Sequence, residues 1–414
     1  MKKALCLVEF NVPTGFGTVG TNLLNQFYKK LPNIYFDVLS PNYEGLTYQY
    51  NDRIRVASAK NLDPQLNDFG VLAAQKYLAS GDYDYFFCCN DISIGIDLAP
   101  LIKFTKSELK KINVKQFKSF FYFPIDNDFK NLNVFAPKEI PKESEYHKYQ
   151  CGLEVFDELA TYTEFGKNVL LKHQPNLKGK LKVIPHGTSK EFDVIQDNQK
   201  LEFRKEYFGE NSDKFIFLNL NKNNPRKDLP STIFAFEDAV KNWTHTTKPF
   251  LYLHCIDSPT GWNLKQILNQ TTLKENIDYN ILDTNNFEFS KVENINKIYN
   301  ICDIGITTAT GGGWELFITE CYATKLPLIA PNHTSFKELS YGEMYSTLLK
   351  TLYPCSFTFD SIVREQIDIY ELSDLMINAP YKIEEYKNKS NKAYLFARQL
   401  DWFIISDKFL SFFK

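Results

Sequence analysis

Two adjacent basic residues, Arg226 and Lys227, follow the apolar segment FIFLNL at a point where a strand is expected to end and a helix to begin. Arginine offers a planar fork of hydrogen-bond donors and lysine a compact charge, so together they suit two neighbouring phosphate groups. The backbone amides at the start of a helix add further donors for an anion. The pair therefore predicts a diphosphate-binding loop, although a solvated basic turn is the more ordinary explanation of this motif alone.

A second candidate ligand site is the run TGGGWELFITE (310–320), which follows the apolar segment ICDIGITT. Its three glycines leave backbone amides accessible where a helix begins. Glu320 is expected two turns into that helix, where its carboxylate can accept hydrogen bonds from both hydroxyls of a ribose. The alternative explanations are an exposed helical glutamate for Glu320 and a core aromatic residue for Trp314.

A third glycine-rich turn follows the first apolar segment, in the run NVPTGFGTVG (11–20). Gly15, Phe16 and Gly17 form a turn at which a ligand can approach the backbone closely. A tight turn without any ligand explains this motif equally well.

Short apolar runs alternate with longer amphipathic stretches along the whole chain, which is typical of repeated β-α units. Runs such as FIFLNL are apolar throughout, as strands of a parallel sheet covered on both faces are. Strands are expected at 4–10, 35–40, 83–89, 117–124, 159–163 and 181–185, and in a second series at 214–220, 250–255, 278–282, 302–307 and 326–330. Helices are expected between the strands, for example at 19–30, 68–80, 228–241, 261–270, 291–300 and 314–324.

The polar stretch 188–212 separates the two series of strands, and 414 residues exceed one typical hydrophobic core. The predicted fold class is α/β, with two Rossmann-like, doubly wound domains (1–195 and 196–395) facing each other across a cleft. The aromatic segment 396–414 is expected to be helical and to pack back on the first domain. Ligands of open α/β sheets bind at the carboxyl ends of the strands, so the chemistry is expected between the domains.

Taken in order, these motifs resemble those of glycosyltransferase family 4, and the resemblance covers most of the chain. Further matching segments are FFYFPIDND (120–128), TYTEFGKNVL, VIPHGTSKEF, LNLNKNNPRKD, YLHCIDSPTGWNL, LYPCSF and the tail around Trp402. The resemblance implies the GT-B fold and a retaining, hexosyltransferase-like enzyme. It further implies a nucleotide-diphosphate sugar as donor substrate, with no obligatory metal and no other cofactor.

The resemblance also implies roles for individual residues. Arg226 and Lys227 correspond to the cations that stabilise the departing diphosphate, and Glu320 corresponds to the carboxylate that holds the donor ribose. Asp126 is implied to lie beside the donor sugar, as a catalytic residue. The remaining donor-binding residues are Gly15, Phe16, Gly17, Gly312, Gly313, Trp314 and Leu316. Cleavage of the donor places negative charge on the leaving diphosphate, and preorganised cations and amides stabilise that charge.

The sequence departs from the family pattern at one important position. Gly312 stands where the family has the first of two glutamates, the one that contacts the sugar. Glu315, three residues later, is predicted to supply this carboxylate and is counted among the catalytic residues. The alternatives are that the sugar is held differently, or that the chain is a catalytically inactive module that binds nucleotide sugars.

Composition limits the other classes of function. A net charge of −2 argues against a protein held on nucleic acid by its overall charge. The eight cysteines are scattered along the chain, as reduced thiols are, and no apolar segment reaches the roughly 18 residues of a membrane span. A cytoplasmic protein is therefore expected. The Asp-x-Asp pairs Asp82/Asp84 and Asp126/Asp128 supply two carboxylates each, too few for a metal cage, so no metal site is predicted.

The acceptor is left open between a glycan, a protein, a lipid and a modified DNA base. The segment Lys103–Lys118 holds six lysines and one glutamate in the first domain. Such a basic segment is a candidate contact for nucleic acid, a phospholipid surface or an anionic glycan. A solvated helix face is the more ordinary explanation.

Overall fold

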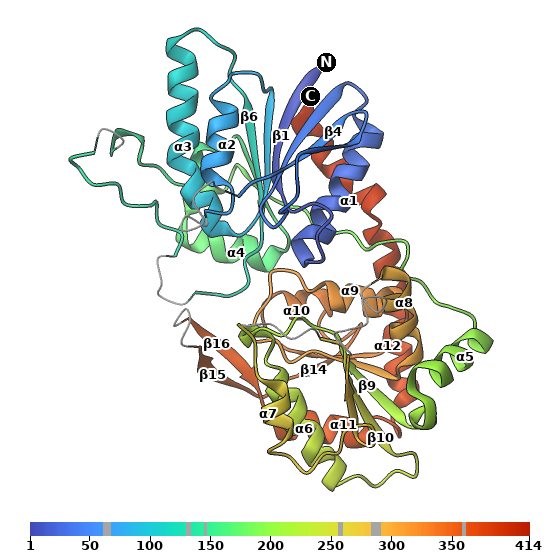
Figure 1. The fold of residues 1–414 in the computed structure, drawn as a ribbon. Helices are drawn as coiled ribbons and strands as arrows, with labels where there is room; N and C mark the ends of the chain where they lie inside the picture. The colour runs from blue at the N-terminus through green and yellow to red at the C-terminus, as the bar shows by residue number, and fades with distance from the viewer. Residues whose placement is uncertain (61–67, 130–133, 145–146, 256–259, 283–290, 358–361) are drawn as a thin grey trace. The chain divides into compact units, whose positions relative to one another are not determined.

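The computed structural model describes residues 1–60, 68–129, 134–144, 147–255, 260–282, 291–357 and 362–414. These residues form two compact units, Met1–Gly187 with Trp402–Lys414, and Thr188–Asp401. Each unit contains a sheet with helices packed on it; the first sheet is mainly parallel and the second wholly parallel (Figure 1). The predicted α/β fold class, with two Rossmann-like sheets, is confirmed.

The first unit is built on an eight-stranded sheet in the order β3-β4-β2-β1-β5-β6-β7-β8, in which only β3 is antiparallel to its neighbour. The strands are β1 (Lys2–Val8), β2 (Ile34–Ser40), β3 (Tyr48–Asn51), β4 (Ile54–Ser58), β5 (Tyr85–Cys89), β6 (Lys118–Phe123), β7 (Glu158–Thr161) and β8 (Leu181–Val183). All residues of β5 are buried, as expected for a strand covered on both faces. Because β1 pairs with both β2 and β5, the order of strands reverses at β1.

The helices of the first unit are α1 (Gly15–Lys30), α2 (Val71–Leu78), α3 (Ile92–Lys111), α4 (Glu164–His173) and, from the end of the chain, α13 (Trp402–Ser406). The aromatic tail is part of this unit because its rings enter the core. Phe409 and Phe413 contact Phe27 of α1, with ring centroids 5.8 and 5.1 Å apart. The Tyr85 hydroxyl also donates a hydrogen bond to the carbonyl of Phe413 at 2.7 Å. Burial of these rings attaches the end of the chain to the first sheet.

The second unit is built on a six-stranded, wholly parallel sheet in the order β11-β10-β9-β12-β13-β14. Its strands are β9 (Phe215–Asn219), β10 (Pro249–Leu253), β11 (Tyr279–Ile281), β12 (Ile304–Ile306), β13 (Leu328–Pro331) and β14 (Thr347–Leu349). Alternate residues of β9 enter different buried clusters, with Ile216 and Leu218 in one and Phe215 and Phe217 in the other. Both faces of this sheet are therefore covered.

The helices of the second unit are α5 (Asp197–Phe208), α6 (Leu229–Lys241), α7 (Leu264–Leu268), α8 (Val292–Ile301), α9 (Leu316–Ala323), α10 (Thr334–Leu339), α11 (Ile369–Asn378) and α12 (Ile383–Ala397). A two-stranded antiparallel hairpin, β15 (Leu352–Ser356) with β16 (Val363–Ile367), extends beyond the main sheet (Figure 1). Among the described residues, no helix combines the length and apolarity needed to cross a membrane.

Each predicted strand and helix has a counterpart, but several elements were not predicted. The polar stretch 188–212 contains α5, whose Phe208 is buried and whose Phe203 and Tyr207 pack against the same cluster. Three aromatic side chains thus anchor a helix whose other residues are polar, apart from the exposed Leu201. The strands β3, β4 and β14 and the hairpin were also missed.

The two units divide the chain at different residues from those predicted. Residues 188–195 and 396–401 belong to the second unit, and the chain returns to the first unit at Trp402. The expected continuous helix at the end of the chain is interrupted at Arg398–Leu400, between α12 and α13. Of the segment YLHCIDSPTGWNL, residues 256–259 lie outside the described residues.

Candidate functional site

The candidate site lies at the strand end of the second unit where the order of strands reverses. Strand β9 is flanked by β10 on one side and β12 on the other, so the loops that follow β9 and β12 leave the sheet side by side. Ligands of doubly wound sheets bind at such switch points, outside the carboxyl ends of the strands. Arg226 and Lys227 are in the first of these loops and the glycines 311–313 in the second.

Local hydrogen bonds determine the conformation of the basic loop. The Asn224 side chain accepts a hydrogen bond from the backbone amide of Lys227 at 3.2 Å and caps the short 3-10 turn Pro225–Lys227. Asp228 follows in the left-handed region, with φ 47°, and α6 begins at Leu229. The two basic residues are therefore held in a turn between β9 and α6, as the sequence indicates.

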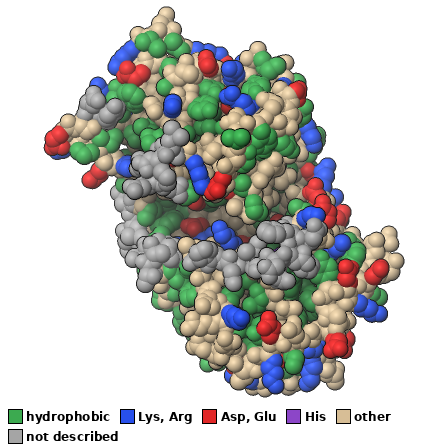
Figure 2. Space-filling view, in the orientation of Figure 1, with side chains coloured by type: hydrophobic (Ala, Val, Ile, Leu, Met, Phe, Trp, Pro, Cys, Tyr) green, Lys and Arg blue, Asp and Glu red, His purple; other side chains and the backbone are tan. Residues whose placement is uncertain are grey.

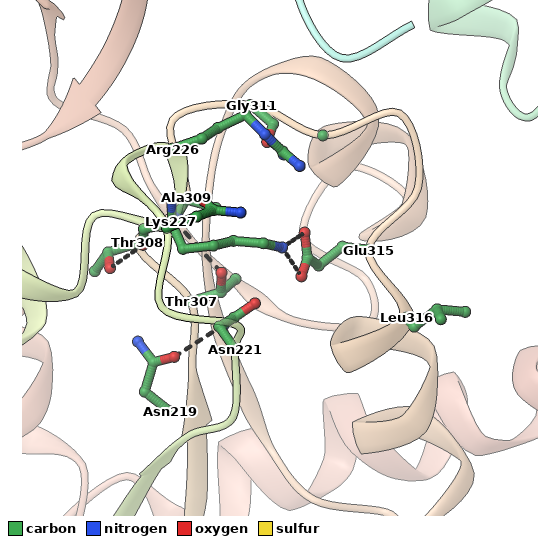
Figure 3. Close-up of polar contacts among 12 residues, drawn as sticks. Asn219, Asn221, Arg226, Lys227, Thr307, Thr308, Ala309, Gly311, Glu315 and Leu316 are labelled. Atoms are coloured by element: carbon green, nitrogen blue, oxygen red, sulfur yellow. Dashed lines mark hydrogen bonds and ion pairs between the residues drawn. The ribbon is translucent and has the colours of Figure 1, made fainter. Parts of the chain in front are cut away.

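The two basic side chains point toward the glycine-rich loop (Figure 3). Arg226 Nη1 donates to the carbonyl oxygen of Gly311. Lys227 Nζ donates to both carboxylate oxygens of Glu315 and lies 2.5 Å from Oε2. The Lys227 side chain is only 11% exposed and that of Glu315 only 5%. Lys227 and Glu315, both predicted as catalytic residues, thus form a buried ion pair with each other.

Backbone-directed hydrogen bonds join the two loops independently of these charges. The amide of Thr310 donates to the backbone carbonyl of Arg226 at 2.8 Å, and the Thr308 hydroxyl donates to the carbonyl of Asp228 at 2.8 Å. Thr232 of α6 lies 2.9 Å from the Thr308 hydroxyl and accepts from Asn219 Nδ2 at 2.8 Å. These polar groups are buried and mutually satisfied, so they define the loop geometry rather than a ligand preference.

The glycine-rich loop is closely packed at Gly312. The Ser335 hydroxyl donates to the Gly312 carbonyl at 2.6 Å. A Cβ at this position would lie 2.7 Å from Cε1 of the buried Phe336 ring. The glutamate that glycosyltransferase family 4 carries at this position therefore has no room here unless Phe336 moves.

The neighbours of Gly312 have different surroundings. Gly313 is buried, and Trp314 is partly buried and packs against the core cluster that contains Phe317. Leu316 is the first residue of α9 and directs its side chain away from Lys227 (Figure 3). Because α9 begins at Leu316, Glu320 lies just over one turn into the helix rather than two.

Glu320 is a partly buried carboxylate held by a tyrosine. The Tyr299 hydroxyl, from α8, donates to Glu320 Oε2 at 2.7 Å. The pKa of Glu320 is raised to about 7, mainly by burial; the Tyr299 hydrogen bond lowers it and the nearby charge of Glu315 adds a smaller rise. This carboxylate therefore changes protonation state near neutral pH, which an ordinary exposed helical glutamate does not.

Sequence reasoning missed several residues that build this site. The buried asparagines Asn219 and Asn221 hydrogen-bond to each other at 2.8 Å at the end of β9. Asp228 is also buried, and burial raises its pKa to about 6, although Ser231 and Gln366 both donate hydrogen bonds to it. The sequence does contain two signals for a polar site at this end of the sheet: the asparagines that follow β9 and the pair Thr307–Thr308 that follows β12. Tyr299, on a different helix from Glu320, had none.

The remaining predicted site residues belong to the first unit. Gly15, Phe16 and Gly17 begin α1, where the Thr14 hydroxyl accepts from the amide of Gly17 at 2.9 Å. A Cβ on Gly17 would lie 2.1 Å from the carbonyl oxygen of Val12, so close backbone packing alone requires a glycine here. Asp126 follows β6 and is partly buried.

The lysines of the basic segment are directed to separate partners within the first unit. Lys106 lies 2.7 Å from Asp157, Lys111 pairs with Glu108 at 2.6 Å, and Lys115 pairs with Asp84. Lys118 donates to the last backbone carbonyl of the chain at 3.2 Å. On the face shown in Figure 2, basic and acidic side chains are interspersed. These contacts account for much of the basic segment without a ligand.

No described group of three His, Cys, Asp or Glu side chains is arranged to hold a metal ion. Of the two Asp-x-Asp pairs, Asp84 pairs with Lys115, and Asp128 lies 3.7 Å from Lys172. His186 is buried and lies 2.7 Å from the Tyr122 hydroxyl through Nδ1, and burial lowers its pKa to about 3. It is therefore neutral at physiological pH.

The fold is similar to those of several solved proteins, and the similarity covers nearly the whole chain. A sucrose-phosphate synthase from Thermosynechococcus elongatus has a TM-score of 0.71 and 12% identity, with 100% of this chain and 98% of that chain covered. A glycosyltransferase from Rickettsia africae gives 0.67 and 16%, covering 100% and 98%. HepE from Anabaena, solved with UDP-glucose, gives 0.65 and 12%, covering 99% of each chain.

The chain therefore has the GT-B fold, as the sequence analysis predicted. At these identities the likeness establishes the fold and not the reaction. No protein-family profile matches the sequence, and no curated protein matches it significantly.

Proposed function

We propose that this chain is a retaining, metal-independent glycosyltransferase that transfers a hexose from a nucleotide-diphosphate sugar to an acceptor. The observation that carries the proposal is the meeting of Arg226 and Lys227 with the glycine-rich loop at the switch point of the second sheet. Cations, loop backbone and a carboxylate are the groups that a sugar nucleotide requires. They meet where doubly wound sheets bind nucleotides.

The chemistry follows from where charge develops. When the bond between the sugar and the diphosphate breaks, negative charge collects on the leaving phosphate oxygens. Arg226 and Lys227 would stabilise that charge, aided by the backbone of the glycine-rich loop, and their positions are already defined by the Asn224 cap and the Thr310 bond. Little rearrangement of the protein backbone is then needed during the reaction.

Two carboxylates of the second unit are assigned to the proposed donor site, and the first-unit residues keep the roles that the sequence resemblance implies. Glu320, ionised above its pKa of about 7, would accept hydrogen bonds from the ribose hydroxyls. Glu315 would contact the sugar in place of the glutamate that Gly312 replaces. The turn Gly15–Gly17 and Asp126 would contact the phosphates and the sugar, as in the family that the sequence resembles.

Structural neighbours support a uridine nucleotide as the donor. HepE was solved with UDP and with UDP-glucose, and an Escherichia coli trehalose-6-phosphate protein was solved with UDP-2-fluoro glucose. We extend UDP-glucose to this chain as the first donor to test.

A cytoplasmic location is proposed on the basis of the thiols. None of the eight cysteines, all of which are described, forms a disulfide, and six of them are buried. Free thiols persist in reducing compartments.

Thermal unfolding with a panel of sugar nucleotides tests donor binding. A ligand at about 100 times its dissociation constant stabilises the folded state by about 2.7 kcal/mol, which gives a measurable shift in Tm.

Release of UDP from UDP-glucose, followed with and without a chelator, then tests the reaction. We expect a Tm shift with UDP-glucose and a rate unchanged by chelation, and an α-linked donor should yield an α-linked product. A rate abolished by chelator and restored by a divalent metal would contradict metal independence.

A second candidate is a catalytically inactive module that binds nucleotide sugars. Gly312 favours it, because the carboxylate of the family is missing and Phe336 fills the space. Binding of UDP-glucose without release of UDP, in the presence of a broad set of acceptors, would support this alternative.

A further inference from the structure

The buried Lys227–Glu315 pair carries a consequence for ligand selection. Nζ of Lys227 directs hydrogen bonds at both oxygens of the Glu315 carboxylate, and both side chains are nearly inaccessible to water. An ammonium group has three donors, so this bidentate contact occupies most of its hydrogen-bonding capacity. In this state the cation is neutralised by the protein itself.

A diphosphate that binds Lys227 must therefore compete with Glu315. Two anions contacting one buried ammonium repel each other, and a buried charge that loses its partner is strongly destabilised. Binding of the diphosphate thus requires the Glu315 carboxylate to leave Lys227. The energetic cost of that movement depends on what the carboxylate contacts next.

The surroundings of Glu315 make its displacement from Lys227 less costly for a sugar nucleotide than for a bare nucleoside diphosphate. The charge of Glu315 already raises the pKa of Glu320, so a Glu315 carboxylate that no longer pairs with Lys227 remains near another acidic group without a cation to offset their repulsion. A sugar attached to the diphosphate brings hydroxyl donors that can satisfy the displaced carboxylate. A bare nucleoside diphosphate brings no such donors, and its terminal phosphate carries an additional negative charge.

We propose, resting on the function proposed above, that Glu315 is a specificity-determining residue that favours the intact sugar nucleotide over its nucleoside diphosphate product. It does so by competing for Lys227 whenever no sugar is present to receive its carboxylate. After the sugar has been transferred, Glu315 returns to Lys227 and promotes release of the diphosphate. The same residue thereby links binding of the sugar to availability of the phosphate-binding cation.

The test compares the binding of UDP and UDP-glucose to the full chain and to Glu315→Gln by titration calorimetry. A neutral amide of the same shape no longer competes for Lys227, so the dissociation constant for UDP should fall about tenfold, the value of one modest charge-assisted contact. UDP-glucose should gain less affinity, because its sugar loses a carboxylate contact, and its turnover should fall. The dissociation constant for UDP divided by that for UDP-glucose should therefore be smaller in Glu315→Gln than in the unmodified chain.

Two further variants keep this test interpretable. Glu315→Asp retains the charge on a shorter side chain, so it should give an intermediate UDP affinity. In the Lys227→Ala background, adding Glu315→Gln should change UDP affinity by less than about twofold, because the group under competition is gone. Asp303→Asn serves as the matched control. It removes a carboxylate from the ion pair with Arg204 (2.8 Å) immediately before β12, at the opposite end of that strand.

The outcomes separate this inference from the proposed function. Weaker or unchanged UDP binding by Glu315→Gln would assign the pair a purely structural role and overturn the inference. An equal gain in UDP affinity in the Lys227→Ala background would also overturn it, since competition for Lys227 is then not the cause. If the unmodified chain binds neither UDP nor UDP-glucose, the proposed function is contradicted and the inference falls with it.

Discussion

The two units place opposite charges at equivalent points of similar sheets. In the second unit, the loop after β9 carries Arg226 and Lys227. In the first unit, the order of strands reverses at β1, and the residue that follows this strand is the buried Glu9. Its carboxylate accepts hydrogen bonds from the Thr14 hydroxyl and from Asn42 Nδ2, and the loop after β5 adds Asp91.

This difference shows that the architecture supplies a position and the side chains supply the ligand preference. Both switch points place loops and a helix start at the carboxyl ends of parallel strands. A cationic loop suits phosphates, whereas a buried carboxylate beside the start of α1 opposes a free anion there. The glycine-rich turn of the first unit, with Gly15, Gly17 and Gly20, is therefore a weaker signal for phosphate binding than the basic loop of the second unit.

The largest expected effect comes from removing the basic side chain itself. Arg226→Ala should lower turnover by about 10²- to 10³-fold, the usual effect of deleting one group that stabilises transition-state charge. The loops should remain joined, because Thr310 bonds to the backbone of Arg226 and not to its side chain. Release of UDP from UDP-glucose measures the rate, and thermal unfolding measures the stability.

Arg204 is the matched control for Arg226 in the same unit. It bonds the carbonyls of Ser212 and Ile301 and pairs with Asp303, next to the amino end of β12. Arg204→Ala should therefore lower stability while the remaining folded protein keeps its kcat. If Arg226→Ala behaves in the same way as Arg204→Ala, the cationic loop is structural and the contrast between the two units disappears.

Glu320→Gln should give the next largest effect, a loss of about 10- to 100-fold in UDP affinity. The substitution removes charge-assisted hydrogen bonds to the ribose, which are worth about 1.5–3 kcal/mol. In the unmodified protein, UDP affinity should rise as pH increases through about 7, because the carboxylate becomes ionised there. The folded-state pKa lies above the ordinary value of 4.5, so this group's contribution to stability falls as pH rises between those values.

Measuring UDP affinity at several pH values, from about 5.5 to about 8.5, tests whether it depends on the ionisation of Glu320. Glu320→Gln should remove the pH-dependent step, whereas Tyr299→Phe keeps the carboxylate and loses only the 2.7 Å bond, so its effect should be smaller. A pH step that persists in Glu320→Gln would assign it to another group, such as Asp228.

Gly312→Glu should lower stability and should not raise activity. Its Cβ would lie 2.7 Å from Phe336, and such overpacking of a core costs about 1–3 kcal/mol. Gly312→Ala adds only the Cβ and isolates this clash from the added charge. An active and stable Gly312→Glu would instead show that Phe336 yields readily, and would favour the inactive-module alternative for the natural sequence.

Local patterns explain what the sequence could predict. Uninterrupted apolar runs gave the main strands, because both faces of these strands are buried. Arg226 and Lys227 were recognisable because basic residues directly after such a strand fall at the end of the sheet. The order of motifs then indicated the GT-B fold, which the structural neighbours confirm.

What the sequence could not predict depends on residues far apart in the chain. Nothing near Lys227 indicates that Glu315 neutralises it, and nothing near Gly312 indicates that Phe336 fills the space beside it. Likewise, Glu320 was predicted to bind ribose, but nothing near it in the sequence indicates that Tyr299 of α8 donates a hydrogen bond to it. The helix α5 was missed because three aromatic side chains, rather than a regular apolar stripe, attach it to the core.

Glu9→Gln should have the smallest effect and completes the comparison from the side of the first unit. A glutamine keeps one carbonyl acceptor for Asn42, and its amide can donate to the Thr14 hydroxyl, which accepts as well as donates. The net cost should therefore be about 0.5–1.5 kcal/mol of unfolding free energy, measured by denaturant titration. UDP affinity should change less than in Glu320→Gln, within about twofold, because glutamine keeps the cap at Thr14 in place and the cations that bind the phosphates belong to the second unit. A change in UDP affinity as large as that of Glu320→Gln would instead mean that the charge at the strand end of β1 matters for nucleotide binding as much as the Glu320 carboxylate does.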